Sequence, residues 1–244
     1  MFKKILIATA LIAMIGALVF GAVNNTFAQN GNPGSAQGSY GRNSNAVINL
    51  PAASGTLNAE EAAALLYMRE EEKLAHDVYV TLGSQWNLPI FQNISRSEQT
   101  HTDAIKALID RYGLTDPASS KVGVFTNPDL QALYNDLVTK GGLSLADALK
   151  AGATIEEIDI RDLETHLAQI SKADIQQVFT NLERGSNNHL RAFVSALNKQ
   201  TGGIYQPQYL SAETYQAIIS AGMQSGGNGN GGGNRQGGYR GGRP

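Results

Sequence analysis

Helix start and stop signals assign almost all of residues 57–221 to a series of helices. This pattern constrains the fold more than any other feature of the sequence. Asn58, with Glu61 three residues later, is typical of a helix N-terminus, and Gly83 is typical of a helix end. Pro89 favours the first turn of a second long helix. The same signals predict helices over residues 59–82, 89–113, 128–140, 145–170, 172–198 and 212–220. Strand signals, such as alternating runs joined by tight hairpin turns, are nearly absent.

Four of the expected helices are long, and the connection between the second and the third is also long because it includes a short helix. Simple up-and-down bundles have short loops, whereas ferritin-like bundles contain one long crossover connection. The sequence therefore predicts an all-α fold. We expect a ferritin-like four-helix bundle with a long crossover between the second and third helices, plus short extra helices. A segment of this length suits a single hydrophobic core.

The two ends of the chain differ in composition from the helical domain at 57–221. Residues 1–28 contain two early lysines, then an apolar run, and then small residues before the expected cleavage site. This order is typical of a cleaved secretory signal. An uncleaved membrane anchor is the alternative, because the apolar run approaches spanning length. Residues 29–56 are expected to form a flexible Gly/Asn/Ser linker, and residues 222–244 a disordered Gly/Arg-rich tail. We therefore expect an extracytoplasmic protein (secreted, periplasmic or attached to the envelope) with no membrane segment after cleavage.

The charge balance and the lack of cysteine exclude several classes of protein. The formal net charge is −2. Nucleic-acid-binding domains usually have a basic surface patch, so we expect no specific nucleic acid partner. The arginines of the tail could contact nucleic acid or an anionic surface, but a solvated tail is the simpler interpretation. The sequence contains no cysteine, so a metal site would use histidine and carboxylate ligands. Such ligands suit iron, manganese or zinc.

A glutamate and a histidine interrupt the apolar face of the second expected helix. Glu98 and His101 are three residues apart, so they point in the same direction on a helix. Phe91, Ile94 and Ile105 fall on the same stripe, which should face the core. A buried carboxylate needs a partner, and a Glu-x-x-His pair on a bundle helix is typical of a metal site. A buried hydrogen-bonded pair without metal is the alternative interpretation.

The first expected helix contributes another candidate ligand. Of the consecutive acids Glu70, Glu71 and Glu72, only Glu72 falls on the apolar stripe, and the other two are expected to face water. His76 lies four residues after Glu72 and is a candidate for a second ligand or an outer-shell partner. Alternatively, Glu72 is a surface acid paired with His76 or Lys73.

Glu156 interrupts a continuous apolar stripe in the third expected helix and is a further candidate. Asp159 follows three residues later, where a histidine often stands in metal-binding bundles. Thr154 and Glu157 form a possible capping box that would restart the helix in its middle, which would make both glutamates first-turn acids. Glu157 and Asp162 therefore remain possible substitutes for Glu156.

The fourth expected helix places His189 in its apolar stripe. Ser186 stands three residues earlier, where the full di-metal pattern has a glutamate. Glu183 would reach the site only from the flank, and Arg191 is a candidate partner for an acid of the outer shell. A core histidine bonded to a backbone carbonyl is the alternative for His189. His166 lies off the main stripe of the third helix and is expected to be exposed.

Four segments of the sequence resemble a known family. Residues 65–79, 97–101, 155–160 and 185–193 are similar to a bacterial and archaeal family described as a domain of unknown function, DUF2202, within the ferritin-like superfamily. The resemblance covers nearly the whole helical domain and neither end of the chain. It implies a ferritin-like bundle, and it implies no particular reaction. Because Ser186 departs from the Glu-x-x-His pattern of di-iron relatives, one metal ion or an unequal pair of ions is expected.

These candidates together predict an exported metal-binding protein. The expected iron or manganese site consists of Glu72, Glu98, His101, Glu156 and His189. Carboxylate-rich sites leave open positions at which dioxygen or peroxide can bind, so oxidase or peroxidase-type activity is the expectation. The alternative is a non-catalytic helical envelope protein that acts as a binding module. A storage cage fits the flexible ends poorly, whereas a homodimer formed through a helix face is possible.

Overall fold

The computed structural model describes residues 50–53 and 55–222. Its helices are α1 (Ala59–Trp86), α2 (Pro89–Arg111), α3 (Pro128–Gly141), α4 (Leu145–Leu167), α5 (Ala173–Thr201) and α6 (Ala212–Ser220). No strand occurs among the described residues, so the all-α prediction is confirmed. None of these helices is long and apolar enough to span a membrane. The expected signal at 1–28, most of the linker at 29–56 and nearly all of the tail at 222–244 lie outside the described residues.

Helix α1 begins where the sequence predicts but ends later. The Glu61 amide donates to Asn58 Oδ1 at 2.7 Å, and the Asn58 amide donates to Glu61 Oε2 at 3.1 Å, which completes the expected capping box. The helix then continues past Gly83 to Trp86. The Trp86 indole donates to the Gly141 carbonyl of α3 at 2.9 Å. This tertiary contact stabilises an extra turn that the local glycine signal did not indicate.

Helix α4 runs without a break through the point at which a restart was predicted. Gly152 lies against the Phe193 ring of α5, and a Cβ on this glycine would lie 2.5 Å from the nearest ring carbon. The glycine therefore permits close packing of α4 on α5 and does not end a helix. The predicted capping box of Thr154 and Glu157 is wrong. Thr154 Oγ1 lies 3.1 Å from the Tyr205 hydroxyl, and Glu157 binds the same later segment of the chain.

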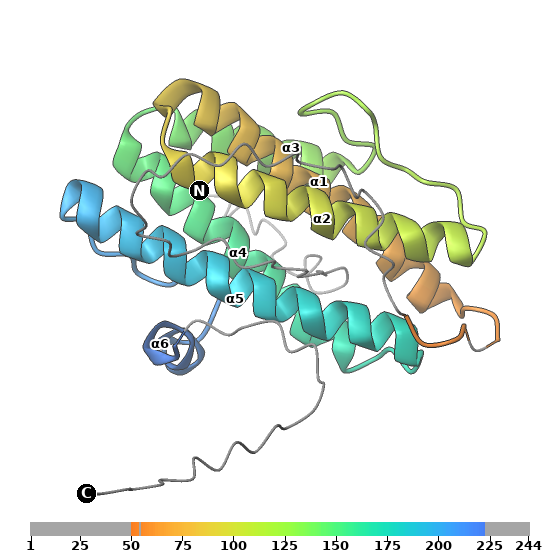
Figure 1. The fold of residues 1–244 in the computed structure, drawn as a ribbon. Helices are drawn as coiled ribbons and strands as arrows, with labels where there is room; N and C mark the ends of the chain where they lie inside the picture. The colour runs from red at the N-terminus through yellow and green to blue at the C-terminus, as the bar shows by residue number, and fades with distance from the viewer. Residues whose placement is uncertain (1–49, 54, 223–244) are drawn as a thin grey trace, which may run out of the picture.

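The four long helices form two hairpins, α1–α2 and α4–α5, that pack on each other (Figure 1). Tyr79 in the second half of α1 contacts Gly152 in the first half of α4. Arg111 at the end of α2 forms an ion pair with Asp174 at the start of α5, with an N–O distance of 2.8 Å. Both pairs of helices are therefore antiparallel, which makes α4 parallel to α2. The connection between α2 and α4 has to return along the bundle, so the long crossover that the sequence predicts is present.

Acidic side chains of α1 hold the crossover against the bundle. The Glu70 carboxylate accepts hydrogen bonds from the Thr126 amide and hydroxyl, each at 2.6 Å, and from the Asn127 amide at 2.8 Å. Asp77 accepts a hydrogen bond from the Gly123 amide at 2.8 Å. The expectation that Glu70 faces water is therefore wrong. The crossover covers this side of α1, and the buried carboxylate satisfies backbone amides of the loop.

Two apolar clusters fill the bundle, one on each side of a polar layer. The first cluster includes Tyr79, Phe91 and Phe193, whose ring centroids lie between 5.0 and 6.4 Å apart. The second includes Leu65 and Phe179. Between the two clusters, the four long helices place the following buried side chains: Glu71, Glu72, Glu98, His101, Glu156, Asp159, Ser186 and His189. Acids and imidazoles are rarely buried in the middle of an apolar core, so this polar layer is the candidate functional site.

Candidate metal centre

The polar layer brings together the five residues predicted as metal ligands. Helix α1 supplies Glu72, α2 supplies Glu98 and His101, α4 supplies Glu156, and α5 supplies His189. No more than 6% of the surface of any of these residues is exposed. One ligand atom from each of Glu98, His101 and His189 lies within 4.8 Å of the other two. This spacing is close enough for the three atoms to share one metal ion after small adjustments.

Glu98 lies in the centre of this group, and each of its oxygens faces a histidine. Its Oε2 accepts a hydrogen bond from His101 Nδ1 at 2.5 Å, and the same nitrogen lies 3.4 Å from Glu72 Oε2. Its Oε1 lies 2.8 Å from His189 Nδ1, which in turn lies 3.5 Å from Glu156 Oε2. The result is two similar half-sites that share Glu98. Each half-site contains one imidazole nitrogen and one further carboxylate.

Several of the facing atoms have no hydrogen-bond partner among the described residues. They are both oxygens of Glu72, one oxygen each of Glu98 and Glu156, and Nδ1 of His189. His189 Nδ1 and Glu98 Oε1 are close but are not aligned as a hydrogen bond requires. Because buried polar groups are almost always hydrogen-bonded or ligated, this set of donor atoms fits a bound cation.

Burial and charge perturb the pKa values of the carboxylates. Burial raises the pKa of Glu72 well above its usual value, and neighbouring carboxylates raise it further. Burial also raises the pKa of Glu156 to about 7, although the charge of His189 opposes the shift. Burial acts in the same direction on Glu98, but His101 and His189 outweigh it, so the pKa of Glu98 falls well below its usual range. A cation between these groups would favour the ionised form of all three.

The two imidazoles differ in charge. Burial lowers the pKa of His101, so this ring is neutral at ordinary pH. Burial has the same tendency at His189, but the carboxylates of Glu98 and Glu156 outweigh it and raise the pKa of His189 to about 10. In the protein without metal, His189 is therefore a cation that balances part of the negative charge. A metal ion that binds Nδ1 has to displace this proton.

Tyr79 holds one of the carboxylates in position. Its hydroxyl donates to Glu156 Oε1 at 2.5 Å, and its ring is fully buried against Phe91 and Phe193. The other oxygen of Glu156 then faces His189. Hydrogen bonds of this kind orient ligands and tune the sites that they form.

Additional acids lie beside the half-site of Glu72. Asp159 is buried with both oxygens unpartnered among the described residues, and its pKa is raised well above its usual value by burial and by neighbouring acids. Glu71 was expected to face water but is buried, and its pKa is raised by burial and by Asp162 of α4. Glu71 lies three residues after Met68, at the edge of the apolar stripe of α1. This spacing is the sequence feature that indicates an inward-facing side chain. These acids therefore resist ionisation beside Glu72, and a bound cation would favour their charged forms.

Two residues predicted to assist the centre make their contacts elsewhere. His76 is half-buried, and its Nδ1 bonds to Asp77 at 2.9 Å beside the crossover. Glu157 accepts hydrogen bonds from the Tyr205 hydroxyl at 2.9 Å and from the Gln208 amide at 2.8 Å. It therefore anchors the segment that leads to α6. This segment covers a second side of α4, which explains why an acid off the main stripe is buried.

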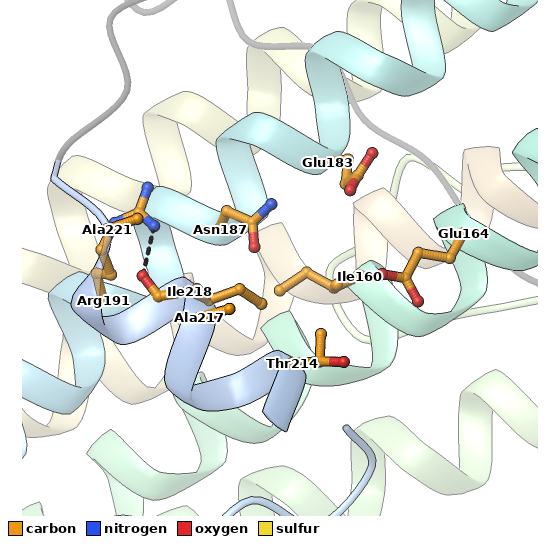
Figure 2. Close-up of a pocket in the computed structure, with 9 residues that line it drawn as sticks. All are labelled: Ile160, Glu164, Glu183, Asn187, Arg191, Thr214, Ala217, Ile218 and Ala221. Atoms are coloured by element: carbon orange, nitrogen blue, oxygen red, sulfur yellow. Dashed lines mark hydrogen bonds between the residues drawn. The ribbon is translucent and has the colours of Figure 1, made fainter. Parts of the chain in front are cut away.

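Glu183 and Arg191 line a separate cavity of about 220 Å³ between α4, α5 and α6. Figure 2 shows Arg191 beside α6, where its Nη1 donates to the Ile218 carbonyl at 2.8 Å. Arg191 thus holds α6 on the bundle, in place of the predicted contact with an acid of the outer shell. Burial and the charge of Glu164 raise the pKa of Glu183. None of the five candidate ligands lines this cavity.

The expectation that His166 is exposed is wrong. Only 8% of its surface is accessible, and its ring packs edge-on against Phe179 of the second apolar cluster. Burial lowers the pKa of His166 to about 4. The ring lies off the main stripe of α4, but α5 covers that side of the helix. His166 therefore belongs to the packing of α4 on α5.

The chain is similar to proteins of one family over the whole of the centre. The model of the family described as "Uncharacterized protein domain (DUF2202)" matches residues 61–222. The "Uncharacterized protein MJ0754" of Methanocaldococcus jannaschii is 51% identical over 173 residues, which cover 70% of this chain and 93% of that protein. The crystal structure of hypothetical protein MJ0754 from Methanococcus jannaschii matches with a TM-score of 0.68 and 50% identity, covering 70% of this chain and 98% of that one.

Proposed function

We propose that this chain, which belongs to the DUF2202 family, binds metal ions through the buried centre between its two helical hairpins. The observation that carries the proposal is the pair of half-sites on either side of Glu98, with buried ligand atoms that lack other partners. The crossover topology and the Glu98/His101 pair also correspond to the pattern of ferritin-like metal proteins. Ser186 in place of a second shared glutamate makes the centre poorer in carboxylate than that pattern.

The five ligands divide between two ions. Glu72 and His101 would hold one ion, Glu156 and His189 would hold the other, and Glu98 would lie between them. Imidazole and carboxylate ligands favour iron or manganese, which supply electrons for reaction with dioxygen or peroxide when bound. The apolar clusters on both sides of the layer limit access of water. We therefore infer an oxidase or peroxidase-type redox protein.

We also propose that the protein acts outside the cytoplasm. This proposal rests on the sequence of residues 1–28, whose two lysines, apolar run and small residues before Gln29 have the order of a secretory signal. Mass spectrometry of the protein exported by its native host tests the proposal. A mature N-terminus at Gln29 supports cleavage, and an intact N-terminus in the membrane fraction supports an anchor.

Elemental analysis of the protein purified without chelator tests the metal centre. We expect iron or manganese at near-stoichiometric amounts in the wild-type protein and its loss in the Glu98→Gln/His101→Gln variant. Glutamine keeps the approximate volume of each side chain, so the bundle should still fold. The control variant is Glu164→Gln/Glu183→Gln, which removes two acids from the separate cavity and should retain the metal.

The same experiment distinguishes a redox metal protein from a non-catalytic binding module. If wild-type protein and both variants remain metal-free after iron and manganese are offered under argon, the redox function is refuted. The alternative, a non-catalytic helical envelope protein that binds a partner, would then stand. If the metal is bound through the centre, consumption of dioxygen and of peroxide by the loaded protein is the next measurement.

A further inference from the structure

The two imidazoles of the centre share a contact on the side away from the carboxylates. Ser97 of α2 is half-buried and precedes Glu98. Its Oγ lies 3.1 Å from His189 Nε2 and 3.3 Å from His101 Nε2. The two rings are stacked, with centroids 5.2 Å apart and planes inclined by 25°. The Ser97 hydroxyl therefore bridges two histidines that belong to different hairpins.

Both rings have the same orientation between Ser97 and the carboxylates. In both histidines, Nε2 lies beside Ser97 and Nδ1 lies beside Glu98. A rotation of either ring by half a turn would place a carbon atom where Nδ1 now stands, and it would break the contact with Ser97. When Nδ1 binds a metal ion, Nε2 carries the hydrogen, and a hydroxyl oxygen can accept from two such donors.

We propose that Ser97 is a positioning residue that orients both ligand histidines. The inference rests on the proposed metal-binding function, because it concerns the nitrogens that would ligate. Metal-bound histidines usually donate their other ring N–H to an outer partner, which fixes the tautomer and the orientation of the ring. Here a single side chain serves both rings and links α2 to α5. Sequence reasoning missed Ser97, although its spacing of four residues before His101 places both on one helix face.

Ser95 offers a matched control two residues earlier in the same helix. Ser95 is buried, and its hydroxyl donates to the Gln92 carbonyl of its own helix at 3.2 Å. Ser95→Ala therefore removes a hydroxyl from α2 without touching either imidazole. Ser97→Ala removes the shared contact, and Ser97→Thr keeps a hydroxyl at the same position.

The test combines Zn²⁺ binding with nitrogen NMR of protein labelled with ¹⁵N in histidine. Zn²⁺ is a suitable probe because it is diamagnetic and accepts imidazole and carboxylate ligands. In wild-type protein we expect His101 and His189 to bind Zn²⁺ through Nδ1 and to keep a hydrogen on Nε2. Ser97→Ala should weaken Zn²⁺ binding about 10–100-fold and disturb this nitrogen pattern. Ser97→Thr should retain most of the affinity, and Ser95→Ala should leave both affinity and pattern unchanged.

In the experiment with Zn²⁺, two results would overturn the role of Ser97. One is ligation through Nε2 in the wild-type protein, and the other is an unchanged affinity and nitrogen pattern in Ser97→Ala. If no form of the protein binds Zn²⁺, iron or manganese, the proposed function fails independently of Ser97. In that case, the nitrogen spectra of the metal-free protein test whether Ser97 contacts and orients the two histidines. The Nε2 resonances of both histidines should shift in Ser97→Ala and not in Ser95→Ala, and their failure to do so ends the proposal.

Discussion

Raising the pH of the metal-free protein from about 7 to about 8.5 is expected to destabilise it by at least about 2 kcal/mol. The cause is His189, whose pKa is raised from 6.5 to about 10 by Glu98 and Glu156, which outweigh the effect of burial. In this pH window the folded protein keeps a proton that the unfolded chain has lost, so stability falls by about 1.4 kcal/mol per pH unit. The raised pKa of Glu72 acts in the same direction. His166 has a lowered pKa of about 4, so its opposite contribution is complete below this window.

Urea unfolding followed by far-ultraviolet circular dichroism, in the presence of chelator, measures this difference. The His189→Gln variant should lose the part of the pH dependence that His189 contributes, about 2 kcal/mol over this window, whereas His166→Gln should keep the full dependence. Mn²⁺ added under argon should stabilise the wild-type protein more at the higher pH, because ion binding displaces a proton. Equal unfolding free energies at both pH values in the metal-free wild type would refute the charge assignment of the centre.

Three substitutions test other contacts of the structure. Gly152→Ala is expected to lower the free energy of unfolding by about 1–3 kcal/mol in urea titrations, because the added methyl would overlap the Phe193 ring. Glu157→Gln is expected to speed hydrogen–deuterium exchange in the segment before α6, because the carboxylate holds backbone amides there; unchanged exchange would contradict its anchoring role. Tyr79→Phe is expected to weaken Mn²⁺ binding about 10–100-fold in calorimetric titrations, because Glu156 loses the hydroxyl that orients it. Equal Mn²⁺ affinity would show that the packing of the core alone orients this carboxylate.

Most of the helical architecture could be predicted because helix ends carry local chemical signals. The capping box at Asn58 and the proline at Pro89 mark helix starts, and both lie where the sequence indicates. The errors come from contacts between distant segments. Trp86 extends α1 through its bond to α3, and Gly152 serves packing against Phe193. Local propensity contains no information about either contact.

The candidate site could be predicted where a helix buries a single stripe. Glu98 and His189 interrupt such stripes, and the structure places both in the polar layer. The apolar stripe gives no indication of burial where a loop covers a second side of a helix. Glu70 is covered by the crossover, and Glu157 is covered by the segment before α6. Periodicity identifies the side that faces the other helices, but it does not tell which irregular segments will fold back onto the remaining sides.

The division of the centre between the two hairpins has a kinetic consequence. The α1–α2 hairpin holds Glu72, Glu98 and His101, and the α4–α5 hairpin holds Glu156 and His189. With an apolar cluster on each side of the layer, an ion bound as proposed would leave when the two hairpins part locally. The residence time of a bound ion would then follow the opening rate of the bundle. Slow exchange with free metal would be a property of the fold, and weak ligands would be sufficient to retain the ion.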